Sequence, residues 1–438
     1  MTAPSRAAER YPVGAELELA ITAVAHGGHC VARIGDQPHG RVVFVRHTLP
    51  GERVVARVTE DGGGAFLRAD AVTVLVAAPD RVPAPCAHAG PGRCGGCDWQ
   101  HVTPDAQRRL KAQVVREQFE RLAGQRLELA EAEELPGGAL HWRTRTVYAT
   151  DPDGHLGLRR HRSHQVQRLP SCPLGVPAVG DSDVLRRSWP GVSGVEVAAD
   201  ADAVAVLEHV AAPQRGRSRR RPDRVRLVEG PRRLRQHVAG RDFAVSSGGF
   251  WQVHPAAAST FTDALLTALA PAPGERVLDL YAGAGLFTAL LADRVGVTGT
   301  VVGIEADPVA VADAAANLSD LPWAHVRRDA VTADVVAAQV GADLVVLDPP
   351  RAGAGRAVMT AILALAPRLI GYLACDPAAL ARDVRTALDA GWRLRSVRVF
   401  DAFPMTHHIE TLAVLEPVLE PVLEPAGHAV PEYARALS

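Results

Sequence analysis

Long hydrophobic runs are missing from this chain of 438 residues. Its apolar runs are broken by Asp, Arg or Gly, and none approaches the ~20 residues that a membrane-spanning helix needs. The first residues, MTAPSRAAERYPVG, carry no apolar stretch behind their charges, which argues against a secretory signal. We therefore expect a cytoplasmic protein with no membrane partner.

An excess of one charge is also missing, since the formal net charge is −1. The whole chain therefore shows no electrostatic footprint of a nucleic-acid binder, although a balanced total can hide separated patches. Lysine is nearly absent: Lys111 is the single one among 48 basic residues. A preference for arginine is typical of GC-rich genomes and carries no functional information by itself.

The length suits about two to four domains. With 47% hydrophobic and 22% charged residues, the composition is that of a globular protein and excludes a disordered or fibrous chain. Residues 1–75 hold short β-branched runs separated by glycine-rich turns, a pattern that favours a small OB-like β-barrel. The proline-rich stretch 79–85 is interpreted as a linker.

The middle of the chain, residues 79–247, is predicted to be a central α+β domain. A helix is expected from about Pro104 to Ala123, because Thr103 is a plausible N-cap and proline suits the first helical position. Arginine and histidine are dense at 141–168, and arginine again at 215–235. Such stretches are usually solvated loops. A surface that faces RNA is the more specific interpretation.

From residue 248 onward, strands and helices alternate, which predicts a Rossmann-like, mostly parallel α/β domain over 248–415. The tail 416–438 contains a repeat with proline at every fourth position, so a disordered extension is expected there. Buried strands of the α/β domain are expected at 277–280, 301–304, 343–347 and 370–374.

A nucleotide-binding signature follows the first of these strands. Gly283-Ala284-Gly285 precedes an apolar helix but lacks the third glycine of a dinucleotide fingerprint. Asp279, Glu305 and Asp329 lie at three successive strand ends. We interpret them as favouring S-adenosylmethionine (SAM) over NAD, since such carboxylates can accept the ribose hydroxyls or meet the adenine amino group. Helix capping is the ordinary alternative for each acid.

Asp348-Pro349-Pro350-Arg351 ends the fourth strand, a motif that recurs in nucleobase methyltransferases. The prolines stiffen the loop beside the reacting methyl group, and Asp348 can orient a polar edge of the substrate. Methyltransferases that act on amino groups usually place an aromatic residue after the prolines. Arg351 at that position weighs against that class.

Cys375 lies just past the fifth strand, at the carboxyl edge where open α/β sheets bind ligands. A buried structural cysteine is the ordinary alternative. A thiolate suits methylation of a pyrimidine, because its addition to carbon 6 makes carbon 5 nucleophilic. A base must then remove the proton from carbon 5. Glu410 is the candidate base, with His407 or His408 as alternatives.

Taken together, these motifs resemble the RNA 5-methyluridine (uracil-C5) methyltransferases over residues 10–415. The resemblance implies SAM-dependent methylation of a uridine at carbon 5 through a covalent adduct of Cys375 at carbon 6, with Glu410 as the base. Residues 250–254, FWQVH, match the motif that opens the catalytic domain, although the family usually ends it with Asn instead of His254. The SAM contacts implied by the resemblance are Gln252, Tyr281, Glu305, Asp329 and Asp348.

The resemblance also covers the N-terminal region, where residues 10–75 are similar to the TRAM domain, an RNA-binding barrel. Four of the six cysteines are similar to the family's ligands for a [4Fe–4S] cluster. Structural zinc is the alternative, and Gly95-Gly96 and Trp99 favour the cluster. Cys30 is expected to be an ordinary buried cysteine. The four implied metal ligands are Cys86, Cys94, Cys97 and Cys172.

RNA is therefore the expected partner of a chain that acts as a monomer. The family analogy favours 23S rRNA over tRNA. Two further interpretations stay open: an amino-group nucleobase methyltransferase, and an RNA-binding iron–sulfur protein without catalytic activity. The joint presence of Cys375, Glu410 and Gln252 argues against the second.

Overall fold

The N-terminal part of the chain forms a closed five-stranded barrel in the order β1-β2-β3-β5-β4. The computed structural model describes residues 10–35, 40–211 and 223–418. Every second side chain of the barrel strands points inward, as at Val43, Val45, Val54 and Ala56, which are fully buried. The predicted barrel is thus confirmed. Its strands are β1 (Glu16–Ala25), β2 (His29–Arg33), β3 (Val42–Arg46), β4 (Arg53–Glu60) and β5 (Phe66–Val76).

The central part of the chain contains a six-stranded sheet in the order β12-β11-β10-β7-β8-β9 and a separate β13-β14 hairpin. Part of the arginine-rich stretch 215–235 lies outside the described residues. Two short helical turns, α2 (Pro177–Gly180) and η2 (Asp183–Arg186), also belong here. The strands are β7 (Arg145–Thr150), β8 (Leu156–Arg159), β9 (Val166–Arg168), β10 (Gly194–Ala199), β11 (Val204–Val210), β12 (Arg224–Glu229), β13 (Arg233–Val238) and β14 (Arg241–Ser246).

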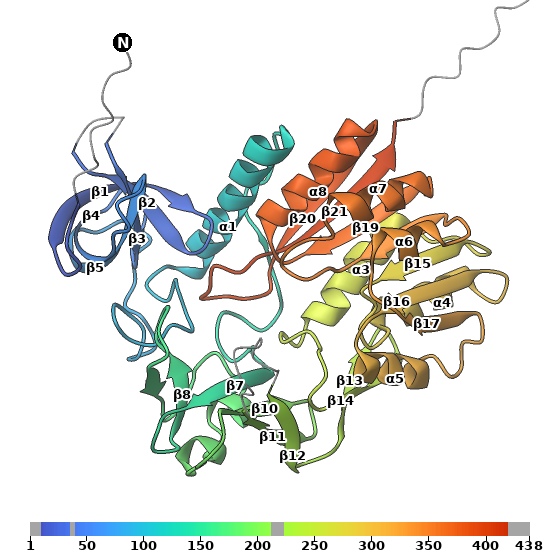
Figure 1. The fold of residues 1–438 in the computed structure, drawn as a ribbon, viewed down its shortest axis with the longest axis horizontal. Coiled ribbons are helices and arrows are strands. Elements are labelled where there is room, and N and C mark those ends of the chain that lie inside the picture. Colours follow the sequence, from blue (N-terminus) through green and yellow to red (C-terminus); the bar gives the residue numbers. More distant parts are fainter. Residues whose placement is uncertain (1–9, 36–39, 212–222, 419–438) are drawn as a thin grey trace, which may run out of the picture.

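The predicted helix 104–123 forms as α1 (Pro104–Gln118) and continues as a π-helical turn, η1 (Phe119–Ala123). It lies between the barrel and the catalytic sheet (Figure 1). Val115 and Phe119 share one apolar cluster with Leu380 of the catalytic domain. The short strand β6 (Glu133–Glu134) pairs with the edge of the catalytic sheet. The segment 79–247 therefore contributes a helix and an edge strand to the catalytic core.

The C-terminal part is an eight-stranded sheet in the order β17-β16-β15-β18-β19-β21-β20-β6. Strands β15 to β19 run parallel, as predicted, and β21 is antiparallel to both neighbours. The strands are β15 (Arg276–Leu280), β16 (Thr300–Glu305), β17 (Ala324–Arg328), β18 (Leu344–Leu347), β19 (Leu369–Ala374), β20 (Trp392–Asp401) and β21 (Glu410–Pro417). The helices are α3 (Ala257–Leu269), α4 (Leu286–Val295), α5 (Pro308–Asn317), α6 (Ala333–Ala337), α7 (Arg356–Ala364) and α8 (Pro377–Asp389).

The start of the predicted disordered tail needs a correction. Glu416 and Pro417 still belong to β21, where they lie opposite Arg393 and Trp392 of β20. Glu416 also forms an ion pair with Arg393 at 2.7 Å. Proline is tolerated here because Pro417 lies beyond the last pair that β21 forms with β19, Ile370 with Leu415, so β20 is its one neighbour in the register. Residues 419–438 lie outside the described residues. No helix in the described ranges is long and apolar enough to cross a membrane.

Candidate active site and cysteine site

The strand order reverses between β15 and β18, because the chain builds β16 and β17 on one side of β15 and β18 and β19 on the other. Open α/β sheets bind their ligands at the carboxyl end of such a switch point. A large cavity lies there. Six of the seven side chains predicted for SAM binding and catalysis line it: Gln252, Tyr281, Glu305, Asp348, Cys375 and Glu410.

The glycine loop after β15 turns sharply at this cavity. Tyr281 and Gly283 have φ angles of 65° and 54°, in the left-handed region that side chains disfavour. Glu305 holds the loop from the next strand: its Oε2 accepts the Gly283 N–H at 2.9 Å, and its Oε1 accepts the Asp307 N–H at 2.7 Å. A Cβ added to Gly283 would meet no atom within 4 Å. An open loop beside an oriented carboxylate suits the ribose of a nucleoside.

The other two acids of the predicted series do not reach the cavity. Asp279 is 1% exposed and accepts a hydrogen bond from Thr288 Oγ1 at 2.5 Å. Burial raises the pKa of Asp279 to about 7. Asp329 is absent from the cavity lining among the described residues, and its carboxylate lies 3.8 Å from Arg327. Of these three acids, Glu305 alone lines the cavity among the described residues, because Asp279 points into the core and Asp329 lies after the outermost parallel strand.

Cys375 and Glu410 meet because β19 and β21 run antiparallel. Ala374 pairs with Thr411, so the next position in register places Cys375 beside Glu410. Glu410 is 4% exposed, and its Oε1 has no hydrogen-bond partner among the described residues. Asp376 anchors the cysteine loop by capping α8, where it accepts the Ala379 N–H at 2.8 Å.

The electrostatics of this pair favour protons on both groups. Burial, reinforced by the negative charges of Glu410 and Asp348, raises the pKa of Cys375 to about 11. Burial, reinforced by Asp348, raises the pKa of Glu410 well above its usual range. A carboxylate with a raised pKa is a stronger base once it is ionised.

The two histidines are poorer bases than Glu410. His408 lines the cavity, but its Nδ1 lies 3.0 Å from Arg351 Nη2. Burial, and then the charges of His407 and Arg351, lower the pKa of His408 to about 3. His407 lies against Asp98, with 2.6 Å between His407 Nδ1 and Asp98 Oδ2. Glu410 therefore remains the best candidate for the base.

Several residues that line the cavity were missed from sequence alone, and Phe250 and Arg143 are two of them. Phe250 is 69% exposed within it, and Arg143 lines both this cavity and the cysteine site. The position of Phe250 at the start of the FWQVH motif was a signal that could have found it. His254, at the end of that motif, is buried and stacks on Trp142 with 6.0 Å between ring centroids.

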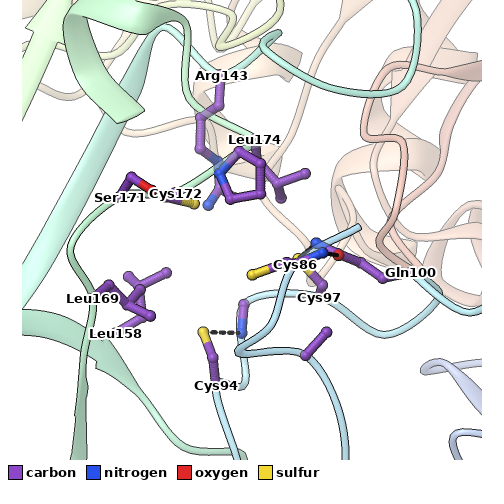
Figure 2. Close-up of a pocket in the computed structure, with 13 residues that line it drawn as sticks. Cys86, Cys94, Cys97, Gln100, Arg143, Leu158, Leu169, Ser171, Cys172 and Leu174 are labelled. Carbon is purple, nitrogen blue, oxygen red and sulfur yellow. Dashed lines mark hydrogen bonds between the residues drawn. The ribbon is translucent and has the colours of Figure 1, made fainter. Parts of the chain in front are cut away.

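The four cysteines proposed as metal ligands surround one small cavity (Figure 2). Burial raises the pKa values of Cys94 and Cys97. Gln100 Nε2 donates a hydrogen bond to Cys97 Sγ at 3.1 Å, and the Gly96 N–H donates one to Cys94 Sγ at 3.4 Å. Hydrogen bonds to sulfur stabilise thiolate ligands and tune the metal. The full set is Cys86, Cys94, Cys97 and Cys172.

In the described part of the chain, no three of these sulfur atoms lie within 4.8 Å of one another. Within the described ranges, the only group of three ligand atoms lying within 4.8 Å of one another is Asp151, Asp153 and His155. A tetrahedral zinc ion with Zn–S bonds of ~2.3 Å would hold four sulfurs about 3.8 Å apart. A [4Fe–4S] cluster binds each cysteine through a different iron, which spreads the sulfurs further.

Comparisons with known proteins identify the family of this chain. The TRAM domain family matches residues 10–72, and the tRNA (Uracil-5-)-methyltransferase family matches residues 233–418. An "Uncharacterized RNA methyltransferase" of Streptomyces avermitilis is 47% identical, over 92% of this chain and 99% of that protein. The 23S rRNA (uracil(1939)-C(5))-methyltransferase RlmD of Halomonas elongata is 34% identical, over 91% of this chain and 89% of its own length.

A solved structure shows the same fold. The Pyrococcus abyssi tRNA (uracil-54, C5)-methyltransferase in complex with S-adenosyl-L-homocysteine has a TM-score of 0.66 and 18% identity, and the match covers 91% of this chain and all of that one. The fold, the TRAM match and relatives of more than 30% identity along nine-tenths of the chain lead to one assignment. This chain belongs to the RNA uracil-C5 methyltransferase family, in the form that carries an N-terminal TRAM domain.

Proposed function

We propose that this protein, acting as a monomer, methylates carbon 5 of a uridine in 23S rRNA. The observation that carries the proposal is the side-by-side placement of Cys375 and Glu410 in the cavity that Glu305 and the glycine loop also line. The choice of 23S rRNA rests on the relatives whose names give that substrate and which share 32–34% identity with this chain.

SAM supplies an electrophilic methyl group on a sulfonium centre. Glu305 is suited to its ribose, because its two oxygens are already oriented by the Gly283 and Asp307 amides. The open face of Gly283 leaves room for the ligand. Gln252, Tyr281 and Asp348 line the same cavity and complete the proposed binding site.

The Cys375 thiol first gives its proton to solvent water, and the thiolate adds to carbon 6 of the uracil. The π electrons of the C5–C6 bond move toward the O4 carbonyl, which leaves an enolate whose carbon 5 is nucleophilic. Carbon 5 takes the methyl group, and the bond between that methyl and the sulfonium sulfur breaks. The positive charge of Arg351 favours the thiolate of Cys375.

Glu410 completes the reaction by taking the proton from carbon 5. The released electron pair restores the C5–C6 double bond and expels the Cys375 thiolate. Glu410 must be ionised at this step, and its Oε1, which has no partner among the described residues, can receive the proton. Its raised pKa makes the ionised form a strong base.

The four cysteines are proposed to hold a [4Fe–4S] cluster through their thiolates. Three of them lie in one loop, and the residues that follow this loop in the chain contact the loop before Glu410. The Asp98 and Trp99 amides both donate hydrogen bonds to the Met405 carbonyl, at 3.1 and 3.0 Å. The cysteine site therefore supports the shape of the active site. Zinc in its place would show as zinc without iron or sulfide in metal analysis.

The test uses protein purified without oxygen and SAM with a labelled methyl group. Unmodified 23S rRNA and total tRNA are supplied in separate reactions, and the digested nucleosides are identified by mass spectrometry. Labelled 5-methyluridine from 23S rRNA alone, lost in Cys375→Ala, supports the proposal. Product from tRNA alone would move the substrate to tRNA. Labelled methyladenosine or methylguanosine would overturn the thiol mechanism in favour of amino-group transfer.

A further inference from the structure

A second charged cavity lies where the barrel meets the turn after β8. The barrel contributes Arg46 at the end of β3 and Arg68 in β5, and the central part contributes Arg93, Arg160 and Arg162. An ion pair of 2.9 Å between Arg162 and Glu60 joins the two sides. None of these residues lines the catalytic cavity or the cysteine site described above.

Four nitrogen atoms on the walls of this cavity are buried without a hydrogen-bond partner in the described part of the chain. They are Arg46 Nε, Arg68 Nε, His29 Nε2 and His161 Nε2. Arg46 is 5% exposed, and its Nη2 reaches only Asp98, at 3.5 Å. Buried N–H groups are normally paired, because leaving them unpaired costs stability. Several such groups around one cavity indicate that an acceptor is supplied from outside.

The charges around the cavity favour an anion. Five arginines line the cavity, and their positive charge exceeds the negative charge of the two lining carboxylates, Glu60 and Asp70. Glu60 is already engaged by Arg162 and by Arg68. Burial, and then the charge of Arg46, lower the pKa of His29 to about 4, so this ring is neutral at physiological pH and can donate one N–H.

We propose that this cavity binds a phosphate group of the RNA backbone. Guanidinium groups are suited to this ligand, because their planar fork can donate two hydrogen bonds to phosphate oxygens. A phosphate contact carries no sequence information but sets the position of the RNA while the target base enters the catalytic cavity. This inference rests on the proposed function, since it assumes an RNA substrate.

A run of phosphates explains the surroundings better than a single free anion. A neighbouring hollow continues the positive surface past this cavity, with Arg159, Arg160 and Arg162 on its wall. A backbone that passes from one hollow to the next would contact both.

The test compares the salt dependence of RNA binding. The variant Arg68→Gln/Arg160→Gln removes two guanidinium groups from the partly exposed rim and leaves buried Arg46 in place. The control is Arg126→Gln, whose side chain is 87% exposed and pairs with Glu120. Dissociation constants for unmodified 23S rRNA are measured between about 50 and 200 mM salt. Melting temperatures equal to that of the wild type establish that the variants fold.

We expect the double variant to lower the slope of log Kd against log salt by about 1 for each RNA phosphate that the protein no longer neutralises. Its affinity at the lower salt should fall by about fivefold, and KM in the methylation assay should rise more than kcat falls. Arg68→Lys/Arg160→Lys should recover part of the affinity, because the charge returns without the fork. An unchanged slope in a folded double variant would overturn the proposal.

Titration with inorganic phosphate separates the two sources of the anion. If wild-type protein binds inorganic phosphate and the double variant does not, while both bind RNA with the same slope, the cavity takes a free anion and the RNA contact is excluded. The methylation assay judges the proposed function independently. Wild-type protein that binds 23S rRNA with the expected slope but makes no 5-methyluridine would refute that function and leave the phosphate site standing.

Discussion

Lys111 Nζ lies 2.5 Å from Asp401 Oδ1, and both groups are buried. This ion pair joins α1 to the last residue of β20. Lys111 Nζ also donates to the Phe403 carbonyl at 3.0 Å. The only lysine of the chain therefore holds the start of the loop that ends at Glu410.

Two further contacts hold the loop that ends at Glu410, one from Gln107 in α1 and one from Asp98 in the loop before α1. Gln107 Oε1 accepts the Met405 N–H at 2.7 Å, and Asp98 Oδ2 accepts the His407 N–H at 3.2 Å. Glu410, the proposed base, is thus positioned by residues that are distant in sequence, between the cysteine loop and the middle of α1. Neither contact reaches the reacting atoms, so these are positioning residues.

Removing the lysine should be costly. Lys111→Met leaves Asp401 buried without its partner, and breaking a buried pair in this way typically destabilises a protein by ~3–5 kcal/mol. The free energy of unfolding is measured by urea titration, with Arg126→Met as an exposed control. A loss below about 1 kcal/mol would mean that the pair behaves like a surface salt bridge.

Replacing Glu410, the proposed base, should stop the reaction after methyl transfer. In Glu410→Gln the amide cannot take the proton from carbon 5, so the bond between Cys375 and carbon 6 should persist. We expect a protein–RNA adduct that survives denaturing electrophoresis, and turnover reduced by about 10²–10⁴-fold. The double variant Glu410→Gln/Cys375→Ala should form no adduct. An adduct in that double variant would place the nucleophile elsewhere.

The pKa of about 11 for Cys375 predicts the pH dependence of its alkylation. A thiol reacts through its thiolate, which is scarce below the pKa and grows tenfold for each pH unit. In the free enzyme, the rate of Cys375 alkylation by iodoacetamide should therefore climb from about pH 7 to about pH 10 without levelling. Peptide mass spectrometry follows the residue directly. A plateau below about pH 9 would show that the thiolate is already stabilised before RNA binds.

Some parts of this site follow from local sequence, and others do not. The barrel, the helix 104–123 and the parallel strands were predictable, because β-branched runs, a proline at the first helical position and alternating elements are local patterns. The position of Glu410 beside Cys375 depends on the antiparallel pairing of β21 with β19, which no local pattern specifies. The chemistry of the reaction offered Glu410, His407 and His408 as candidate bases, and the resemblance to a family favoured Glu410.

Two of the strand-end acids miss the cavity for related physical reasons. Asp279 and Asp329 follow the same sequence pattern as Glu305. Successive side chains of a strand point to opposite faces of the sheet, however, and the strands lie at different distances from the switch point. Asp279 points to Thr288 inside the core, and Asp329 lies after the outermost parallel strand. The packing of α1 on the catalytic sheet was also hidden, since it joins segments far apart in the sequence.

The two carboxylates Glu305 and Asp329 make a matched test of the cofactor site. Glu305→Ala should weaken the binding of S-adenosyl-L-homocysteine by about 10–100-fold, as expected for charged hydrogen bonds worth ~1.5–3 kcal/mol. Asp329→Ala should leave the affinity within about twofold, because Asp329 bonds to Glu305 through its backbone amide, which the substitution keeps. Isothermal titration calorimetry measures both. Equal losses in the two variants would restore Asp329 to the cofactor site.

Gln100 offers a test of the cysteine site that leaves every ligand in place. Its Nε2 donates to Cys97 Sγ, and its Oε1 accepts the Cys86 N–H at 2.9 Å, so it touches two of the four proposed ligand residues. Gln100→Leu removes both bonds, and the loss of such a supporting residue typically weakens metal sites by about 10–100-fold. We expect protein purified without oxygen to contain iron and sulfide in equal amounts, and the variant to lose both faster in air. Gln113→Leu, on the exposed face of α1, serves as the control. Equal retention in variant and control would mean that these bonds hold the loop and do not support a cluster.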